Sequence, residues 1–172
     1  MTGKRNWALV VMGAWMMGSI CMSVVATENF YTIDRLLETS AKAEFYAAVQ
    51  KLGHTPARDL LRYLSSELNR LYFQGWNIAQ LLLGAAALWL LAGGAPRIRR
   101  GILVMLGIVV LMLAYLTPQI VALGRSLDFV PRDPAPPGMQ RFWILHAAYT
   151  SLEMLKLVVG LAVTSWIARS RS

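Results

Sequence analysis

The sequence LYFQGWNIAQLLLGAAALWLLAGGAPRIRRGILVMLGIVVLMLAYLTPQIVAL, residues 71–123, contains two long apolar runs that flank a short basic turn. The segment Gly93–Pro96 ends the first run, because glycine and proline are helix-stop signals. Each run is long enough to cross about 30 Å of hydrocarbon at about 1.5 Å per residue. The three arginines of the turn predict that it is cytoplasmic, since cytoplasmic loops are rich in Lys and Arg. This stretch therefore predicts an antiparallel pair of membrane-spanning helices.

Two further apolar runs lie outside this pair, so we predict an all-α integral membrane four-helix bundle. The expected spans are residues 7–27, 71–92, 102–123 and 142–168. The first run follows two basic residues, as a signal peptide does. It is longer than a usual signal core, so we expect a retained helix. With 56% hydrophobic and 15% charged residues, the 172-residue chain is more apolar than most soluble domains.

The net charge of +8 would suggest nucleic-acid binding in a soluble protein, but the placement of the basic residues predicts orientation in the membrane and no nucleic-acid binding. The segments that we expect on the cytoplasmic side contain basic residues and no acid, and the other loops are nearly balanced. We therefore expect the inner (plasma) membrane, with both termini cytoplasmic. These cytoplasmic basic residues are Lys4, Arg5, Arg97, Arg99, Arg100, Arg169 and Arg171.

The longest loop, residues 28–70, predicts an extracytoplasmic helical extension of the bundle. The apolar spacing of Phe45, Val49 and Leu52 favours a short helix that ends at Gly53. Thr55 and Pro56 then predict the N-cap and first turn of a helix that continues to Ala92. The alternative is that these helices lie flat on the lipid surface. The four prolines of residues 128–138 predict a non-helical strap between the last two spans.

Polar residues inside the expected spans are the candidate site, because polar groups in hydrocarbon usually face the bundle interior. Three interpretations stay open: a structural hydrogen-bond network, a pocket for a small amphipathic molecule, a quinone or a metal, and a catalytic site. The candidate ligand-binding residues are Asn77, Gln80, His146, Tyr149, Glu153 and Lys156.

No sequence motif indicates catalysis or metal binding, so we expect neither a catalytic residue nor a metal ligand. The pair His146 and Glu153 could exchange protons only across two helical turns. Met12, Met16 and Cys21 are residue types that bind Cu(I), but core packing of the first helix explains them better. The cofactor is left unassigned.

Several segments together resemble the bacterial branch of the transmembrane-protein-205-like family of four-helix membrane proteins. The resemblance covers nearly the whole chain, and its best local match is Phe142-x-x-Leu145-His146 followed by Leu152. The stretch ATENFYTIDRLL, residues 26–37, and the sequence Thr117–Ile120 also contribute. The resemblance implies a four-helix fold in a membrane and defines no substrate.

From these features we expect a non-enzymatic inner-membrane protein. It would act as an accessory or scaffold subunit of a membrane complex, or as a small-molecule-binding component. The alternative function is a transporter or resistance factor for a hydrophobic compound or a metal ion. The expected partners are the lipid bilayer and either other membrane subunits or further copies of the chain.

Overall fold

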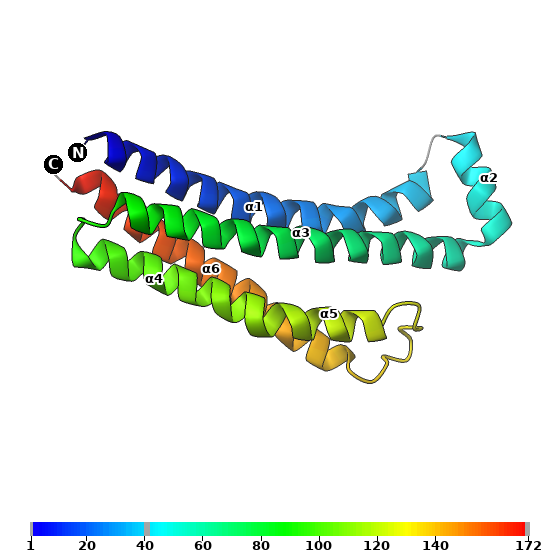
Figure 1. Cartoon of the computed structure of the whole chain (residues 1–172). Coiled ribbons are helices and arrows are strands. Elements are labelled where there is room, and N and C mark those ends of the chain that lie inside the picture. The colour runs from blue at the N-terminus through cyan, green and yellow to red at the C-terminus, as the bar shows by residue number, and fades with distance from the viewer. Residues whose placement is uncertain (1, 40–41, 171–172) are drawn as a thin grey trace.

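The computed structural model describes residues 2–39 and 42–170, and within these ranges it contains helices and no strand. The all-α prediction is therefore confirmed. Figure 1 shows the elements in chain order. They are α1 (Thr2–Thr39), α2 (Ala43–Leu52), α3 (His54–Leu90), α4 (Pro96–Leu111), the π-helical turn η1 (Met112–Leu116), α5 (Thr117–Ser126) and α6 (Met139–Arg169). Arg171, which we predicted to be cytoplasmic, lies outside the described residues.

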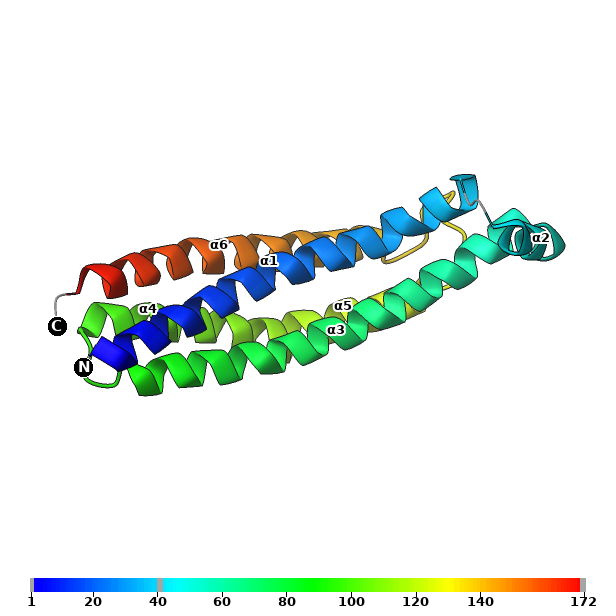
Figure 2. The same cartoon turned by 90° about the horizontal axis from the view of Figure 1, so that it is seen from above.

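The long helices lie side by side in the order α1, α3, α4–α5 and α6, and α6 returns to contact α1 (Figures 1 and 2). The start of α1, the α3–α4 turn and the end of α6 share one end of the molecule, which we call the proximal end. The opposite, distal end carries α2 and the α5–α6 connection. The chain thus runs up and down with alternating helix direction, as a helix bundle does.

Three helical stretches of the described chain are long and apolar enough to cross a membrane: Gly3–Thr39, Pro96–Ser126 and Met139–Arg169. Their length and composition indicate a membrane protein. Helix α3, which contains the predicted span 71–92, is not among them. Its amide side chains Gln74, Asn77 and Gln80 lower its mean hydropathy. The fourth crossing therefore stays a prediction.

The proximal half of the bundle has an apolar core, to which every long helix contributes one buried stripe. Helical spacing of three and four residues brings the members of each stripe onto one face. This proximal core contains Ala8, Met12, Ala87, Leu91, Ile98, Ile102, Met105, Val109, Val163 and Ile167. Gly84 and Gly160 permit close packing here. A Cβ at Gly84 would overlap the Leu106 side chain and lie 2.9 Å from the Trp15 ring, and a Cβ at Gly160 would lie 3.0 Å from Met16 Sδ.

At the distal end α1 and α3 continue together well beyond the length that a bilayer requires. Residues 54–70 of α3 add about 25 Å to its predicted span. Side chains hold the pair together: Asn29 and Asn69 share a hydrogen bond of 2.6 Å, and Ser65 donates to the Asn29 carbonyl. Arg58 and Asp34 also form an ion pair between the two helices, with 2.8 Å between Arg58 Nε and Asp34 Oδ1. The predicted continuity of α3 from the extension into the span is confirmed. The location of this extension outside the membrane stays a prediction.

Helix boundaries follow the sequence signals, with one correction. Helix α2 ends at Leu52, and Gly53 has φ +89°, a conformation that glycine adopts without strain. The predicted N-cap at Thr55 is wrong, because α3 begins at His54 with Gly53 in the N-cap position. The chain between Ser126 and Met139 is non-helical, as its prolines predict.

Candidate functional site

Lys156 is the centre of a buried polar network in the bundle. Its Nζ donates to Glu153 Oε1 at 2.7 Å and also to Gln80 Oε1. The side chain is 1% exposed, so no solvent shares its charge. Glu153 lies three residues earlier on α6, which is the spacing that brings two side chains together on a helix. Glu153 and Lys156 of the candidate site thus form an ion pair, and Lys156 also reaches across to Gln80 on α3.

Asn77 extends the network toward the distal end and joins three helices. It accepts at Oδ1 from Gln80 Nε2 at 3.3 Å and from the Tyr149 hydroxyl at 3.5 Å. Its own Nδ2 donates to Thr117 Oγ1 at 3.2 Å. Five of the six candidate residues thus lie in one network, and their hydrogen bonds fix how far α3, α5 and α6 are displaced along one another.

Trp15 on α1 completes the network, although it is not among the six residues predicted for the site. Its Nε1 donates to Gln80 Oε1 at 3.0 Å, and the indole is fully buried. A signal was present in the sequence, because Trp15 is the one tryptophan near the middle of a predicted span. A buried indole usually has a hydrogen-bond partner. Trp15 therefore brings the fourth long helix into the network.

The turn η1 explains why Thr117 faces this network. Its five residues insert a π turn into the third apolar helix, and the Thr117 N–H bonds to the Met112 carbonyl. Such a turn holds one residue more than an α-helical turn and so rotates every later side chain. Pro118 follows directly and has no N–H to offer to the helix. The π turn thus lies in the turn directly before Pro118.

His146 does not join the network. Its ring packs on Phe142, with 4.4 Å between ring centroids, and on Trp143 at 6.0 Å. Within the described part of the chain no hydrogen bond or ion pair joins His146 to Glu153. The structure therefore places His146 outside the hydrogen-bond network of the other five candidate residues, because its ring packs on aromatic residues of the same helix.

Glu153 and Lys156 are closed off from solvent and from any ligand in this arrangement. Asn77 and Gln80 are fully buried and Lys156 almost so, and a ligand could reach them only if the helices separated. Glu153 Oε2 is buried and accepts no hydrogen bond from the described residues. In the same part of the chain no three His, Cys, Asp or Glu side chains gather into a group that could hold a metal ion. The geometry thus favours the structural interpretation of these polar residues.

No family model, no curated protein and no solved structure matches this chain. The resemblance to the transmembrane-protein-205-like proteins therefore rests on the sequence segments quoted above. Function has to be argued from the chain's own contacts, burial and exposed surfaces.

Proposed function

We propose that the protein is a non-enzymatic, four-span accessory or scaffold subunit of an inner-membrane complex. In this proposal α3 is the fourth crossing. Two of the amides that lower its mean hydropathy, Asn77 and Gln80, are fully buried in the bundle. These two amide side chains therefore contact the other helices and not lipid. Their burial supports a membrane crossing by α3 despite its low mean hydropathy.

The observation that carries the proposal is an apolar stripe along the outer face of α3. At 100° per residue its six members fall within a sector of about 40°. All six are between 49% and 69% exposed. This α3 stripe consists of Leu60, Leu64, Leu71, Ile78, Leu82 and Trp89. Glu67 lies on the same face and is paired with Arg70 and Arg125.

Lipid explains only part of the α3 stripe. Leu71 to Trp89 fall in the predicted span, where exposed apolar side chains meet acyl chains. Leu60 and Leu64 lie in the extension beyond it, where the same face would meet water. An apolar surface that continues out of the bilayer on one helical face fits a partner helix that also continues out of the bilayer. We therefore assign the stripe to a helix of a larger membrane subunit.

The closed interior also supports a scaffold. Apolar side chains of the proximal core fill the interior of the proximal half of the bundle. The polar network fills the interior next to this core. A transporter or resistance factor, the alternative function, needs a route for its substrate. A single copy of this chain offers none without rearrangement of both layers.

A purification experiment tests the proposal. The tagged chain is extracted from its native membrane in mild detergent, and the intact complex is weighed by native mass spectrometry. We expect a stoichiometric complex with a larger membrane protein, and its loss when Leu60 and Leu64 are both changed to Ser. Leu36→Ser is the matched control, because Leu36 is an exposed leucine of the α1 extension that lies off the stripe. Recovery of the chain alone, or only as a symmetric homo-oligomer, would contradict the proposal.

Cysteine labelling tests the orientation separately. Ala135 is exposed in the strap, and Cys21 is the one native cysteine, so Ala135→Cys in a Cys21→Ala background gives a single reporter. We expect a membrane-impermeant maleimide to label it in intact spheroplasts. Labelling that requires permeabilised membranes would reverse the orientation.

A further inference from the structure

The proximal end of the bundle is strongly basic, and the described part of the chain does not neutralise its charge. No Asp or Glu occurs in residues 1–27, 68–127 or 154–172, the segments that contain this end. The ion pairs of the described residues lie at the distal end or in the interior. The charge is thus left to an anion from outside these residues. The described basic side chains of the proximal end are Lys4, Arg5, Arg97, Arg99, Arg100 and Arg169.

Three of these arginines gather where the first turn of α4 lies beside the last turn of α6. Arg97 Cζ is 5.8 Å from the centre of the Trp166 ring. Gly101 lets the two helices approach closely, since a Cβ at Gly101 would overlap a side chain of α6. Arg100 lies three residues after Arg97, and Arg169 lies three residues after Trp166, which is the spacing of neighbours on a helix surface. We call Arg97, Arg100 and Arg169, which are all exposed, the arginine cluster.

The arginine cluster lies at the boundary of the apolar bundle. Ile98 and Ile167 belong to the buried proximal core. Arg97 directly precedes Ile98, and Arg169 follows Ile167 by two residues, so both guanidinium groups begin about 2–3 Å along the axis from a buried apolar side chain. Trp166 is close to the end of the predicted span 142–168, where tryptophan favours the headgroup layer of a membrane. The cluster is therefore at the depth of phospholipid headgroups.

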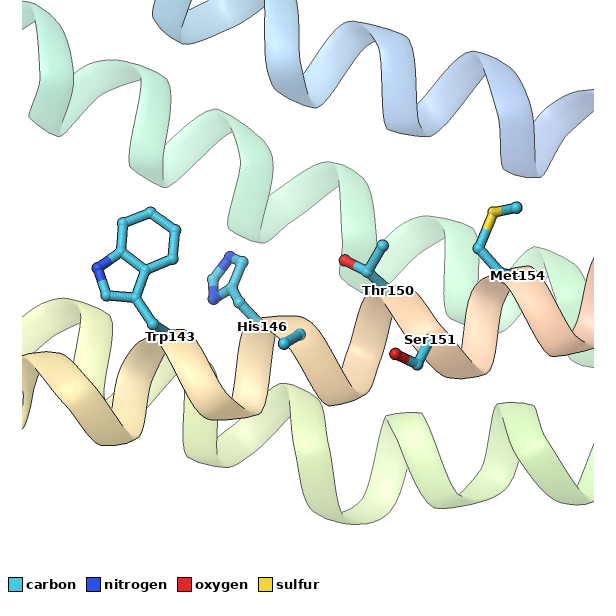
Figure 3. Close-up of a pocket in the computed structure, with 6 residues that line it drawn as sticks. Trp143, His146, Thr150, Ser151 and Met154 are labelled. Atoms are coloured by element: carbon cyan, nitrogen blue, oxygen red, sulfur yellow. The ribbon is translucent and has the colours of Figure 1, made fainter.

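Exposed apolar side chains continue from the cluster toward the middle of the bundle. On α4, Val104 and Leu111 follow Arg97 at intervals of seven residues, so they lie on the same helical face. On α6, Leu155 is exposed and precedes Trp166 by eleven residues, which is about three helical turns. Farther along α6, the described side chains that line the shallow hollow in Figure 3 include no Lys, Arg, Asp or Glu. This surface thus offers cations at its proximal end and apolar contacts along its length.

We propose that the arginine cluster binds the phosphate groups of an anionic phospholipid whose acyl chains lie along α4 and α6. A guanidinium group suits phosphate, because its planar fork of donors can bind two oxygens at once. A soluble polyanion would balance the charge but would leave the adjoining apolar face in water, whereas a phospholipid satisfies both. Three cations without an acid favour cardiolipin, whose headgroup carries two phosphates.

The site rests on the membrane location in the proposed function, but it shares no residue with the α3 stripe and needs no partner subunit. Basic residues that only set orientation in the membrane need no particular lipid, since any Lys or Arg near a span end serves that purpose. Selective binding of one headgroup charge therefore separates this proposal from the orientation signal.

The test uses the delipidated full chain in mild detergent and counts bound lipids by native mass spectrometry. Separate arms titrate cardiolipin and phosphatidylethanolamine, which has no net charge, and a third arm adds inorganic phosphate to the cardiolipin complex. We expect cardiolipin to saturate at one molecule per chain, phosphatidylethanolamine to bind more weakly, and inorganic phosphate to displace neither. R97Q/R100Q/R169Q should bind cardiolipin at least about tenfold more weakly, because each basic residue near an anionic lipid contributes about a factor of five.

The matched control is R35Q/K51Q/R132Q, which removes three exposed basic side chains of the distal end and leaves the same net charge. It should bind cardiolipin as the parent chain does. Equal weakening by the two triple variants would show an effect of net charge and would overturn the proposal. Equal binding of cardiolipin and phosphatidylethanolamine by the parent chain, or displacement of cardiolipin by inorganic phosphate, would overturn it as well.

Salt dependence of the parent chain keeps the test decisive if R97Q/R100Q/R169Q folds poorly by circular dichroism. Cardiolipin binding should weaken as salt rises from about 0.1 M to about 1 M, because the screening length falls from about 10 Å to about 3 Å. Binding that is independent of salt contradicts phosphate recognition. Recovery of the larger subunit is measured on the same variants, so failure of the proposed function is distinguished from failure of this site.

Discussion

Removal of the Lys156 charge should destabilise the bundle far more than removal of the whole Glu153–Lys156 pair. In Lys156→Met, Glu153 loses its one donor, and Oε2 is already without a partner. Gln80 Oε1 keeps its bond from Trp15 and is little affected. Breaking a buried ion pair from one side costs about 3–5 kcal/mol, whereas replacement of both partners by groups of similar volume is often neutral. Uptake of a proton by the isolated carboxyl limits the cost, so we expect about 3 kcal/mol for the single variant. For E153Q/K156M we expect at most about 1 kcal/mol.

The assay is reversible unfolding in mixed micelles of mild detergent and SDS, followed by circular dichroism. Arg58→Met, alone and with Asp34→Asn, is the matched control, because that pair has the same chemistry but is nearly half exposed. An exposed pair contributes about 0–1 kcal/mol, so both control variants should stay close to the parent chain. The reasoning is refuted if Lys156→Met is as stable as the parent, or if E153Q/K156M is as unstable as Lys156→Met.

Two further predictions concern packing and pH. Gly84→Ala should destabilise the bundle by about 1–3 kcal/mol in the same unfolding assay, because its Cβ would overlap the Leu106 side chain and come within 2.9 Å of the Trp15 ring. A Cβ at Gly107 meets nothing within 4 Å, so Gly107→Ala should leave the stability unchanged. Equal effects of the two glycine variants would contradict the packing. The hydrogen bond from Arg58 lowers the pKa of Asp34 below its ordinary 3.8. The stabilisation that the Arg58–Asp34 pair contributes is therefore complete above pH 4, and it is lost as the pH falls through the lowered pKa of Asp34. Amide hydrogen exchange of residues 30–39 should accelerate at that acidic step in the parent chain, and a step of equal size in Asp34→Asn would exclude this origin.

The helices were predictable because their signals are local. Apolar runs, paired glycines and prolines determine where a helix can continue. Helix α3 runs unbroken from His54 to Leu90 because no proline follows Pro56 before Pro96, and the isolated Gly75 and Gly84 are tolerated inside the helical pattern. The start of α3 was misplaced by assigning the cap to Thr55. Gly53 occupies the N-cap position instead, as the residue between α2 and α3 that can take a positive φ.

The candidate site was predictable only where its members share a helix. Asn77 with Gln80 and Glu153 with Lys156 repeat at three residues, so a helical projection finds each pair. Trp15 reaches Gln80 from 65 positions earlier in the chain, and no local pattern encodes that contact. The projection also fails beyond Met112, because a π turn changes the rotation per residue that the projection assumes.

The proposed crossing by α3 would explain how a helix of low mean hydropathy can belong to a membrane bundle. A hydropathy average treats every side chain of a window as if it faced lipid. In α3 the amides of Asn77 and Gln80 face the interior, whereas Gln74, near the distal end of the predicted span, is exposed. Leu71, Ile78, Leu82 and Trp89 face outward. At any level along a four-helix bundle only a few side chains face the interior. A single buried polar network can therefore place several of its amides on one helix. A helix of low mean hydropathy can then be the one that contributes most polar contacts to the bundle interior. If α3 lay outside the membrane, its exposed apolar face would meet water over most of its length.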